Sequence, residues 1–309
     1  MSVKPGVVIR AIQAVGTLRA NESVIVRPEL GGRIQEVHFK EGQAVEKGAP
    51  LVTMETSINA AELEQAKARL GLSQVNDQRM GSLRKKGLGS EQEEDQMRSD
   101  LRVNQASVAL AEARLAKMTV RAPFNGVLGL RLVSVGDYLS PGQDMVNLLN
   151  LDPIKVDFRI PELLLSQIKV GQAIEVKVDA FPDQKFSGAV YAIDPQVDVN
   201  GRSLLLRATI PNKEQRLYAG LFARVDLILE RRDGALLVPE EALVPQGDKQ
   251  YVFKVVEDKA VRTEVKLGQR QGAQVEIADG LKAGDQVVTA GQIKIRDGAP
   301  VKPISLDKG

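Results

Sequence analysis

The chain has 309 residues, enough for two to four modest domains, and its 42 basic residues nearly balance its 40 acidic residues. This balance favours neither a nucleic-acid surface nor an acidic substrate, and an aromatic content of 4% with no Trp gives little material for stacking bases or sugars. Cys is absent, which excludes disulfides, thiolate metal sites and a cysteine nucleophile. The sequence contains no run of about 18 apolar residues, so we expect no membrane-spanning segment in it.

The composition of residues 7–18 predicts a strand interrupted by Gly16. An internal repeat follows, in which similar residues recur at an offset of 94 positions, as Val26 does at Val120. The other pairs at this offset are Arg27 and Arg121, Gly32 and Gly126, Gly42 and Gly136, Val45 and Leu139, Gly48 and Gly142, Leu51 and Met145, and Val52 and Val146. Because glycines at fixed offsets mark tight turns, we predict two copies of one strand-turn-strand unit that close around a shared core.

A first helix is expected over about residues 59–83, between the two copies of the repeat. Its apolar residues fall on two faces: Leu63, Ala66, Leu70 and Met80 on one, and Ala68, Leu72 and Val75 on the other. Gly71 and Gly81 each weaken such a helix by about 1 kcal/mol relative to alanine, so tertiary packing has to hold it. A turn runs from Leu83 to Ser90, and Ser90 with Glu93 predicts a capping box at the start of a second helix.

The second helix carries an apolar seam with alternating spacings of four and three, the pattern of a coiled coil. The seam consists of Met97, Leu101, Asn104, Val108, Ala111, Leu115 and Met118. A second row, which we name the outer stripe, lies about 200° around the helix and consists of Val103, Ala106, Leu110 and Ala113. One hairpin partner covers only one of these faces. The other face is buried either in a small bundle within the chain or against a neighbouring copy, and we favour the neighbouring copy because no third helix of similar length is predicted.

The C-terminal half predicts strands with few helices. Residues 154–160 alternate apolar and polar side chains, as in a half-buried strand, and residues 161–168 predict a short helix with Pro at its first position. Further strands are expected at about residues 173–178, 186–193, 203–210 and 222–229, and this set suits a small barrel. Residues 233–309 contain more strand-forming runs between glycine-bearing turns.

The repeat resembles the two halves of a lipoyl/biotinyl-type domain. The first half is carried by residues 26–34 and 41–51, and the second by residues 119–126 and 135–142. A carrier domain needs a lysine on the hairpin that joins the halves, but Met54-Glu-Thr-Ser57 stands at that place and the chain continues into the first helix. We therefore expect no covalently bound cofactor, and a lipoyl or biotinyl carrier subunit remains a minor alternative.

A lipoyl-like domain split by a coiled-coil hairpin resembles the periplasmic adaptors, or membrane fusion proteins, of tripartite RND-type efflux pumps. Residues 193–195 and 207–212 look like the family's barrel signature, although Asn200-Gly-Arg-Ser203 departs from the usual Thr-Arg-Thr loop, so no role is assigned to that loop. The resemblance implies a mainly β fold with an inserted α-helical coiled-coil hairpin. Its expected domains are a membrane-proximal β-domain (1–21 and 233–309), a split lipoyl-like domain (22–58 and 119–150), the hairpin (59–118) and a β-barrel domain (151–232).

The turn of the hairpin matches the tip motif through which such adaptors engage a TolC-type outer-membrane channel. Arg79, Leu83 and Ser90 stand at the spacing of that motif, so the resemblance implies that they dock on the channel. Each residue also has a purely structural interpretation: Arg79 as a solvated side chain, Leu83 as a seam residue and Ser90 as a helix cap. A cap and a docking residue are compatible roles.

The resemblance further implies a non-enzymatic protein that links an inner-membrane RND transporter to the outer-membrane channel and exports drugs or other small hydrophobic compounds. It implies six copies around the channel axis, in the periplasm, held at the inner membrane by an N-terminal segment that we expect to precede Met1, because residues 1–4 lack the apolar core of a signal peptide. An adaptor of an ATP-driven (ABC-type) exporter and a structural coiled-coil envelope protein are the alternatives.

No constellation for catalysis or metal binding is predicted. His38 is the single histidine and is expected to be structural, and no nucleophile elbow or phosphate-binding glycine loop is present. The acidic cluster at residues 91–95 suits the N-terminal turn of a helix, and Arg84-Lys-Lys86 is interpreted as a solvated turn. The methionines are scattered, which argues against copper or silver handling.

Overall fold

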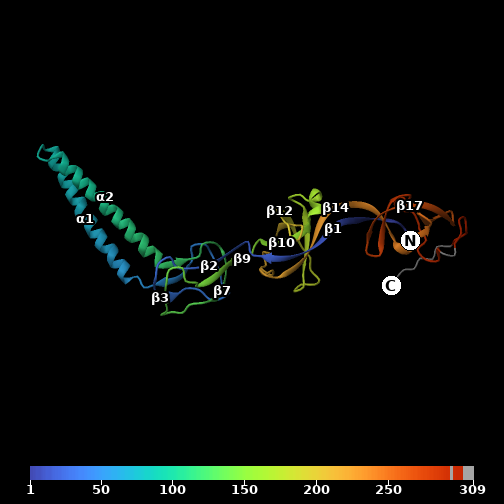
Figure 1. Cartoon of the computed structure of the whole chain (residues 1–309), viewed down its shortest axis with the longest axis horizontal. Helices are drawn as coiled ribbons and strands as arrows, with labels where there is room; N and C mark the ends of the chain where they lie inside the picture. The colour runs from blue at the N-terminus through green and yellow to red at the C-terminus, as the bar shows by residue number, and fades with distance from the viewer. Residues whose placement is uncertain (293–294, 302–309) are drawn as a thin grey trace. The chain divides into compact units, whose positions relative to one another are not determined.

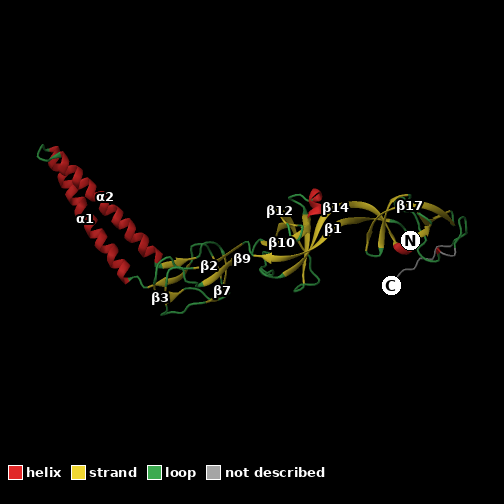
Figure 2. Cartoon of the chain, in the orientation of Figure 1, coloured by secondary structure: helices red, strands yellow, loops and turns green. Residues whose placement is uncertain are grey.

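The computed structural model describes residues 1–292 and 295–301, which form two compact units. The first, the hairpin unit, comprises residues 19–154 and 212–219; the second, the barrel unit, comprises residues 1–18, 155–211 and those from 220 onward. Strands make up most of the barrel unit, whereas the hairpin unit combines short strands with two long antiparallel helices, α1 (Ser57–Lys85) and α2 (Glu91–Lys117) (Figures 1 and 2). The predicted fold class, mainly β with an inserted helical hairpin, is confirmed.

The β part of the hairpin unit consists of two four-stranded sheets. One sheet has the order β2 (Glu22–Val26), β9 (Val146–Asn150), β7 (Gly126–Arg131) and β4 (Ala44–Val45). The other has the order β6 (Thr119–Arg121), β5 (Pro50–Met54), β3 (Gly32–Val37) and β8 (Tyr138–Leu139). Residues of both repeat copies fill one core between them, including Ile34, Leu51, Leu128 and Leu148, each with an exposed fraction of 1% or less.

The repeat predicted from the sequence is present as an exchange of hydrogen bonds between the two copies. Gly42 N–H donates to Leu128 O and Gly136 N–H donates to Ile34 O, both at 3.0 Å, so residues 94 positions apart swap roles. A second pair follows the same rule: Gly48 N–H to Ala122 O at 2.8 Å and Gly142 N–H to Pro28 O at 2.9 Å. All four donating glycines have positive φ, between 73° and 95°, which explains why glycine stands there in both copies.

The helical hairpin is inserted between two neighbouring strands of one sheet. β5 ends at Met54, α1 begins at Ser57, α2 ends at Lys117 and β6 begins at Thr119. Met54 N–H donates to Met118 O at 2.8 Å, which closes the two strands across the base of the hairpin. The insertion point therefore lies at the predicted place, where a carrier domain would have its lysine-bearing turn.

The helices pack along the predicted seam. Every seam residue of α2 is buried or half-buried, whereas the outer stripe is exposed, with exposed fractions of 62% at Val103 and 55% at Leu110. No third helix covers this stripe in the described part of the chain, so the bundle within one chain does not form there. On α1 the seam also uses Ser73, only 7% exposed, whose hydroxyl donates to Leu70 O at 2.9 Å. The sequence missed Ser73 because its polar group is satisfied inside its own helix.

The barrel is a closed ring of six strands in the barrel unit. The order is β1 (Lys4–Arg19), β10 (Ile154–Pro161), β13 (Ser203–Ile210), β12 (Phe186–Asp198), β11 (Ala173–Val178) and β14 (Phe222–Pro239), and β14 pairs with β1 to complete the ring. β10 and β13 alternate buried and less buried side chains as predicted. The expected short helix is a 3-10 helix, η1 (Glu162–Gln167), which begins after Pro161 rather than at it.

Strand β1 is continuous, although we expected Gly16 to interrupt it. A Cβ at Gly16 would lie 2.6 Å from Asp157 O, so glycine there permits close approach of β10 instead of breaking the strand. Residues 11–17 of β1 pair with residues 222–228 of β14 inside the barrel, and residues 4–6 pair with residues 235–237 beyond it. β1 thus serves both the barrel and the last domain, whereas the sequence assigned residues 1–21 to the last domain alone.

The last domain continues the same sheet from β14. Its strands follow in the order β18 (Gln274–Asp279), β17 (Lys259–Gln271), β16 (Lys249–Val256) and β15 (Val244–Gln246), with a short 3-10 helix, η2 (Glu240–Ala242), after β14. A small core joins the N-terminus to these strands through Val3, Val238, Val252 and Ile277. Within the predicted range 233–309, residues 293–294 and 302–309 lie outside the described residues.

Candidate functional site

The tip of the hairpin presents the three residues that the sequence singled out. Arg79 and Leu83 lie one turn apart on α1, at positions i and i+4, and Ser90 is the N-cap of α2 on the other side of the turn. Arg79 and Ser90 are exposed and Leu83 is half-buried. Among the described residues the Arg79 side chain has no hydrogen-bond or ion-pair partner. Its guanidinium is therefore available to an external acceptor.

The predicted capping box is present at Ser90. The Ser90 N–H donates to Glu93 Oε2 at 3.4 Å, a long bond, and the reciprocal arrangement with the Glu93 amide is also present. Glu91, Glu93 and Glu94 occupy the first turn of α2, where negative charge is favourable to the helix dipole. The cap therefore fixes the beginning of α2 while its exposed side chain remains accessible to solvent.

One part of the tip differs from the expected solvated turn. Arg84 Nε lies 2.8 Å from Glu94 Oε2, and Arg98 Nη2 lies 3.0 Å from Glu94 Oε1. Glu94 is only 19% exposed, so one carboxylate ties the end of α1 to the start of α2. The sequence pattern gave no sign of this contact, since it depends on how the turn brings residues 84 and 94 together.

Leu88 is a further residue at the tip that sequence reasoning missed. It lies in the turn between the helices, and its exposed fraction is 74%. The one signal in the sequence was a large apolar residue between Gly87 and Gly89. A leucine between two glycines has no neighbouring side chain in sequence to cover it.

The outer stripe borders a groove along the middle of the hairpin. The groove has a volume of about 430 Å³ and is lined by Arg69, Leu72, Ser73, Asn76, Met97, Asp100, Val103 and Asn104. Val103 and Leu72 are exposed apolar side chains beside polar groups from both helices. Of the four predicted packing residues only Val103 lines the groove; Ala106, Leu110 and Ala113 lie along the exposed remainder of α2.

A second groove of about 480 Å³ lies where the hairpin meets the edge strands β2 and β6. The repeat-related Arg27 and Arg121 both line it, together with Lys117. These cations are engaged within the chain: Arg27 Nε lies 2.6 Å from Asp144 Oδ1, Arg121 donates to Gly48 O at 2.9 Å, and Lys117 pairs with Glu29. These contacts hold the base of the hairpin and the sheet edges in place. The three cations that line the groove therefore have structural roles within the chain.

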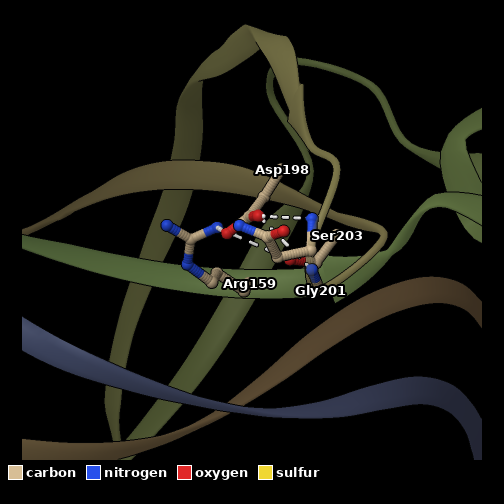
Figure 3. A network of polar contacts seen from close by, with 5 residues as sticks. Arg159, Asp198, Gly201 and Ser203 are labelled. Carbon is tan, nitrogen blue, oxygen red and sulfur yellow. Dashed lines mark hydrogen bonds and ion pairs between the residues drawn. The ribbon is translucent and has the colours of Figure 1, made fainter.

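The turn between β12 and β13, to which the sequence assigned no role, is held by a polar network (Figure 3). The N–H groups of Gly201 and Asn200 donate to Asp198 Oδ1, and Arg159 lies 2.9 Å from Asp198 Oδ2 and 3.5 Å from Ser203 Oγ. The two backbone donors, with Arg159 adding to them, lower the pKa of Asp198 below its ordinary value. This network orders the turn.

The barrel signature residues also make structural contacts. Arg207 on β13 forms a two-bond ion pair with Asp157 on β10, at 2.5 and 2.7 Å, and this contact raises the pKa of Arg207 above its ordinary value. Asn212 is 5% exposed and donates to Leu151 O and Leu217 O, both at 2.9 Å. It therefore attaches the segment of residues 212–219 to the hairpin unit.

Across residues 1–292 and 295–301, no group of three or more His, Cys, Asp or Glu side chains gathers as metal ligands would. His38 Nε2 lies 2.7 Å from Thr53 Oγ1, between adjacent strands, as a structural histidine would. No described helix is both long and apolar enough to cross a bilayer.

Three family models together match most of the chain. Residues 22–150 match the barrel-sandwich hybrid domain of CzcB-like proteins, and residues 153–231 match the β-barrel domain of CusB-like proteins. Residues 235–303 match the C-terminal permuted SH3-like domain of YknX. These three segments follow one another along the chain without overlap.

Similar proteins agree with these matches along nearly the full length. The multidrug resistance protein MdtA of Klebsiella pneumoniae is 30% identical over 323 aligned positions, which cover 97% of this chain and 78% of that protein. A MacA–MexA chimera with the Pseudomonas aeruginosa MexA α-hairpin has the same fold, with a TM-score of 0.68 at 22% identity over 92% of this chain and 98% of that one. MacA from Actinobacillus actinomycetemcomitans gives a TM-score of 0.56 at 20% identity, over 94% and 99% of the two chains. The chain therefore belongs to the periplasmic adaptor, or membrane fusion protein, family of efflux pumps.

Proposed function

We propose that this protein couples an inner-membrane RND-type transporter to a TolC-type outer-membrane channel, and that the assembled pump exports drugs or other small hydrophobic compounds. The observation that carries the proposal is the tip, where Arg79 is exposed and has no partner among the described residues. A guanidinium offers several N–H donors in a fixed plane, which suits carboxylates or backbone carbonyls at the end of a helical channel. Leu83 adds apolar contact and Ser90 adds a hydroxyl.

The outer stripe supports side-by-side packing of hairpins in the same assembly. Val103 and Leu110 expose more than half of their side-chain surface on a helix whose opposite face is already packed on α1. An apolar stripe left uncovered on a long helix suits contact with another helix of the same kind. We propose that Val103, Ala106, Leu110 and Ala113 meet a neighbouring copy, and that six copies surround the channel axis.

The proposal includes a division of labour along the chain. The hairpin (59–118) reaches the channel, and the lipoyl-like domain (22–58 and 119–150) supports the hairpin. The barrel (151–232) and the membrane-proximal domain (233–309), which share strand β1, face the transporter. The protein works in the periplasm, at the inner membrane that holds the transporter. Its role is mechanical, with no catalytic step.

The decisive test is export in cells that carry the transporter and channel, measured beside the thermal midpoint of each purified variant. Arg79→Ala and Leu83→Ala should reduce resistance, while the midpoint of Arg79→Ala stays unchanged because an exposed side chain without partners holds little together. Arg102→Ala, an exposed arginine on α2 far from the turn, is the matched control and should export normally. Normal resistance of both tip variants at normal expression would refute docking through these residues.

The class of transporter needs a separate experiment. Cross-linking in membranes, followed by identification of the attached inner-membrane protein, should yield an RND transporter. Recovery of an ATP-driven exporter instead would keep the adaptor role and replace the transporter by the ABC-type alternative.

A further inference from the structure

The turn at the hairpin tip has the backbone pattern of a Schellman motif. Leu88 N–H donates to Leu83 O at 3.0 Å, and Gly87 N–H donates to Arg84 O at 2.9 Å. Gly87 has a φ of +74°, the left-handed conformation that ends such a helix and that glycine adopts without strain. The sequence therefore ends α1 at a defined residue and fixes the backbone direction at Leu88.

In this motif the residue at Leu88 commonly packs against the residue at Leu83. Here Leu83 is half-buried, whereas Leu88 remains 74% exposed. Closing the turn thus leaves most of the Leu88 side chain uncovered. A single exposed leucine is ordinary on a protein surface, but this one stands on a fixed turn at the end of the hairpin, next to the residues of the proposed docking site.

Further contacts hold the turn rigid. Glu94 joins Arg84 and Arg98 across the two helices, at 2.8 and 3.0 Å. Gly89 lies so close to α1 that a Cβ there would approach Met80 Sδ to 3.3 Å and the Arg84 amide nitrogen to 3.4 Å. A side chain presented on a rigid turn loses little conformational freedom on binding, which favours it as an anchor.

The charges on either side of the turn indicate what kind of surface Leu88 fits. On the α1 side, Arg79, Lys85 and Lys86 are exposed and have no ion-pair partner among the described residues, while on the α2 side Glu91 and Glu93 are exposed carboxylates. An apolar anchor with exposed cations on its α1 side complements an apolar hollow whose rim carries carboxylates or carbonyl oxygens on the side that faces α1.

We propose that Leu88 is the main apolar anchor of the tip and seats in an acid-rimmed apolar hollow between helices at the end of the outer-membrane channel. The inference rests on the proposed function and deepens it. It assigns to Leu88 the apolar contact with the channel that the sequence motif assigned to Leu83. The main role of Leu83 is then to stabilise the turn that presents Leu88.

The test measures binding of the full chain to a TolC-type channel purified in detergent and immobilised. Leu88→Ser should weaken binding about tenfold or more, mainly through faster dissociation, and Leu88→Met should stay within about threefold of the parent protein. Leu163→Ser is the matched control, because Leu163 is 87% exposed but lies in η1, and its binding should be unchanged. The thermal midpoints of all three variants should match that of the parent protein.

Arg79→Ala, measured in the same series, separates failure of this inference from failure of the proposed function. If Arg79→Ala weakens binding and Leu88→Ser does not, the tip docks without Leu88 and the inference is overturned while the function stands. If the unmodified chain does not bind the channel at all, both are overturned. Loss of binding in Leu88→Ser with retention in Leu88→Met supports the anchor, since the methionine keeps apolar bulk and the serine does not.

Discussion

The hairpin and the two-sheet domain that carries it bury their side chains very differently. Only Leu63, Ser73 and Ala111 are buried along the whole of α1 and α2, whereas fourteen apolar residues form a closed core between the two sheets. The sheets exchange hydrogen bonds between residues far apart in sequence, while the helices depend on their own ladders, one seam and a few ion pairs. The hairpin can therefore devote most of its surface to partners, because the sheets supply a separate stable base.

The largest expected effect is in the core between the sheets. Leu148→Ala removes a side chain that is fully buried, and should lower the free energy of unfolding by about 2–5 kcal/mol. Leu70→Ala, at a half-buried seam position of α1, should cost only about 1 kcal/mol, since less apolar area is lost. Urea denaturation followed by circular dichroism measures both. Equal losses in the two variants would contradict this comparison, because they would mean that the two interiors are equally well packed.

A second prediction compares equivalent positions in the two repeat copies. A Cβ at Gly126 would lie 2.5 Å from Leu149 O, a backbone atom, whereas a Cβ at Gly32 would come no closer than 3.2 Å to Met54 Cβ and 3.3 Å to Met54 Sδ. Gly126→Ala should therefore destabilise by about 1–3 kcal/mol and Gly32→Ala by less than about 1 kcal/mol. Thermal denaturation of the two variants measures both losses in stability. A larger loss in Gly32→Ala would contradict the assigned asymmetry.

These two regions also differ in how much the sequence could predict. The repeat was detectable because a positive φ is a local demand that glycine meets at the same place in each copy. The seam and the strand alternation were detectable because one packed face imposes its period on the sequence. Burial of Ser73, the pairing of Arg84 with Glu94 and the exposure of Leu88 were not, since each depends on how a turn or a partner helix lies in space. The docking and packing roles stay predictions.

A smaller effect is expected at the cap of α2. Ser90→Ala removes the hydroxyl that accepts from the Glu93 backbone N–H and should cost about 0.5–1 kcal/mol, while the Ser90 N–H can still donate to the Glu93 side chain. Hydrogen exchange should show faster opening of the first turn of α2 and no change in the sheets. Ser107→Ala is the control: the Ser107 hydroxyl bonds back to Val103 O within its own helix, so alanine should be neutral or slightly stabilising. Equal effects at both serines would argue against a working cap.

The smallest effect on folding is expected at Leu110, where the effect on assembly should be the largest. Leu110→Glu changes a side chain that is already 55% exposed, so the free energy of unfolding should move by less than about 0.5 kcal/mol. In an assembled pump the same glutamate would be buried without a partner, and an unpaired buried charge is costly. Cross-linking of neighbouring copies in cells should fall sharply while the thermal midpoint of the purified protein stays constant. Glu112→Gln, an exposed neighbour outside the stripe, should change neither quantity. Unfolding of Leu110→Glu, or undiminished cross-linking, would show that the outer stripe is not the surface between copies.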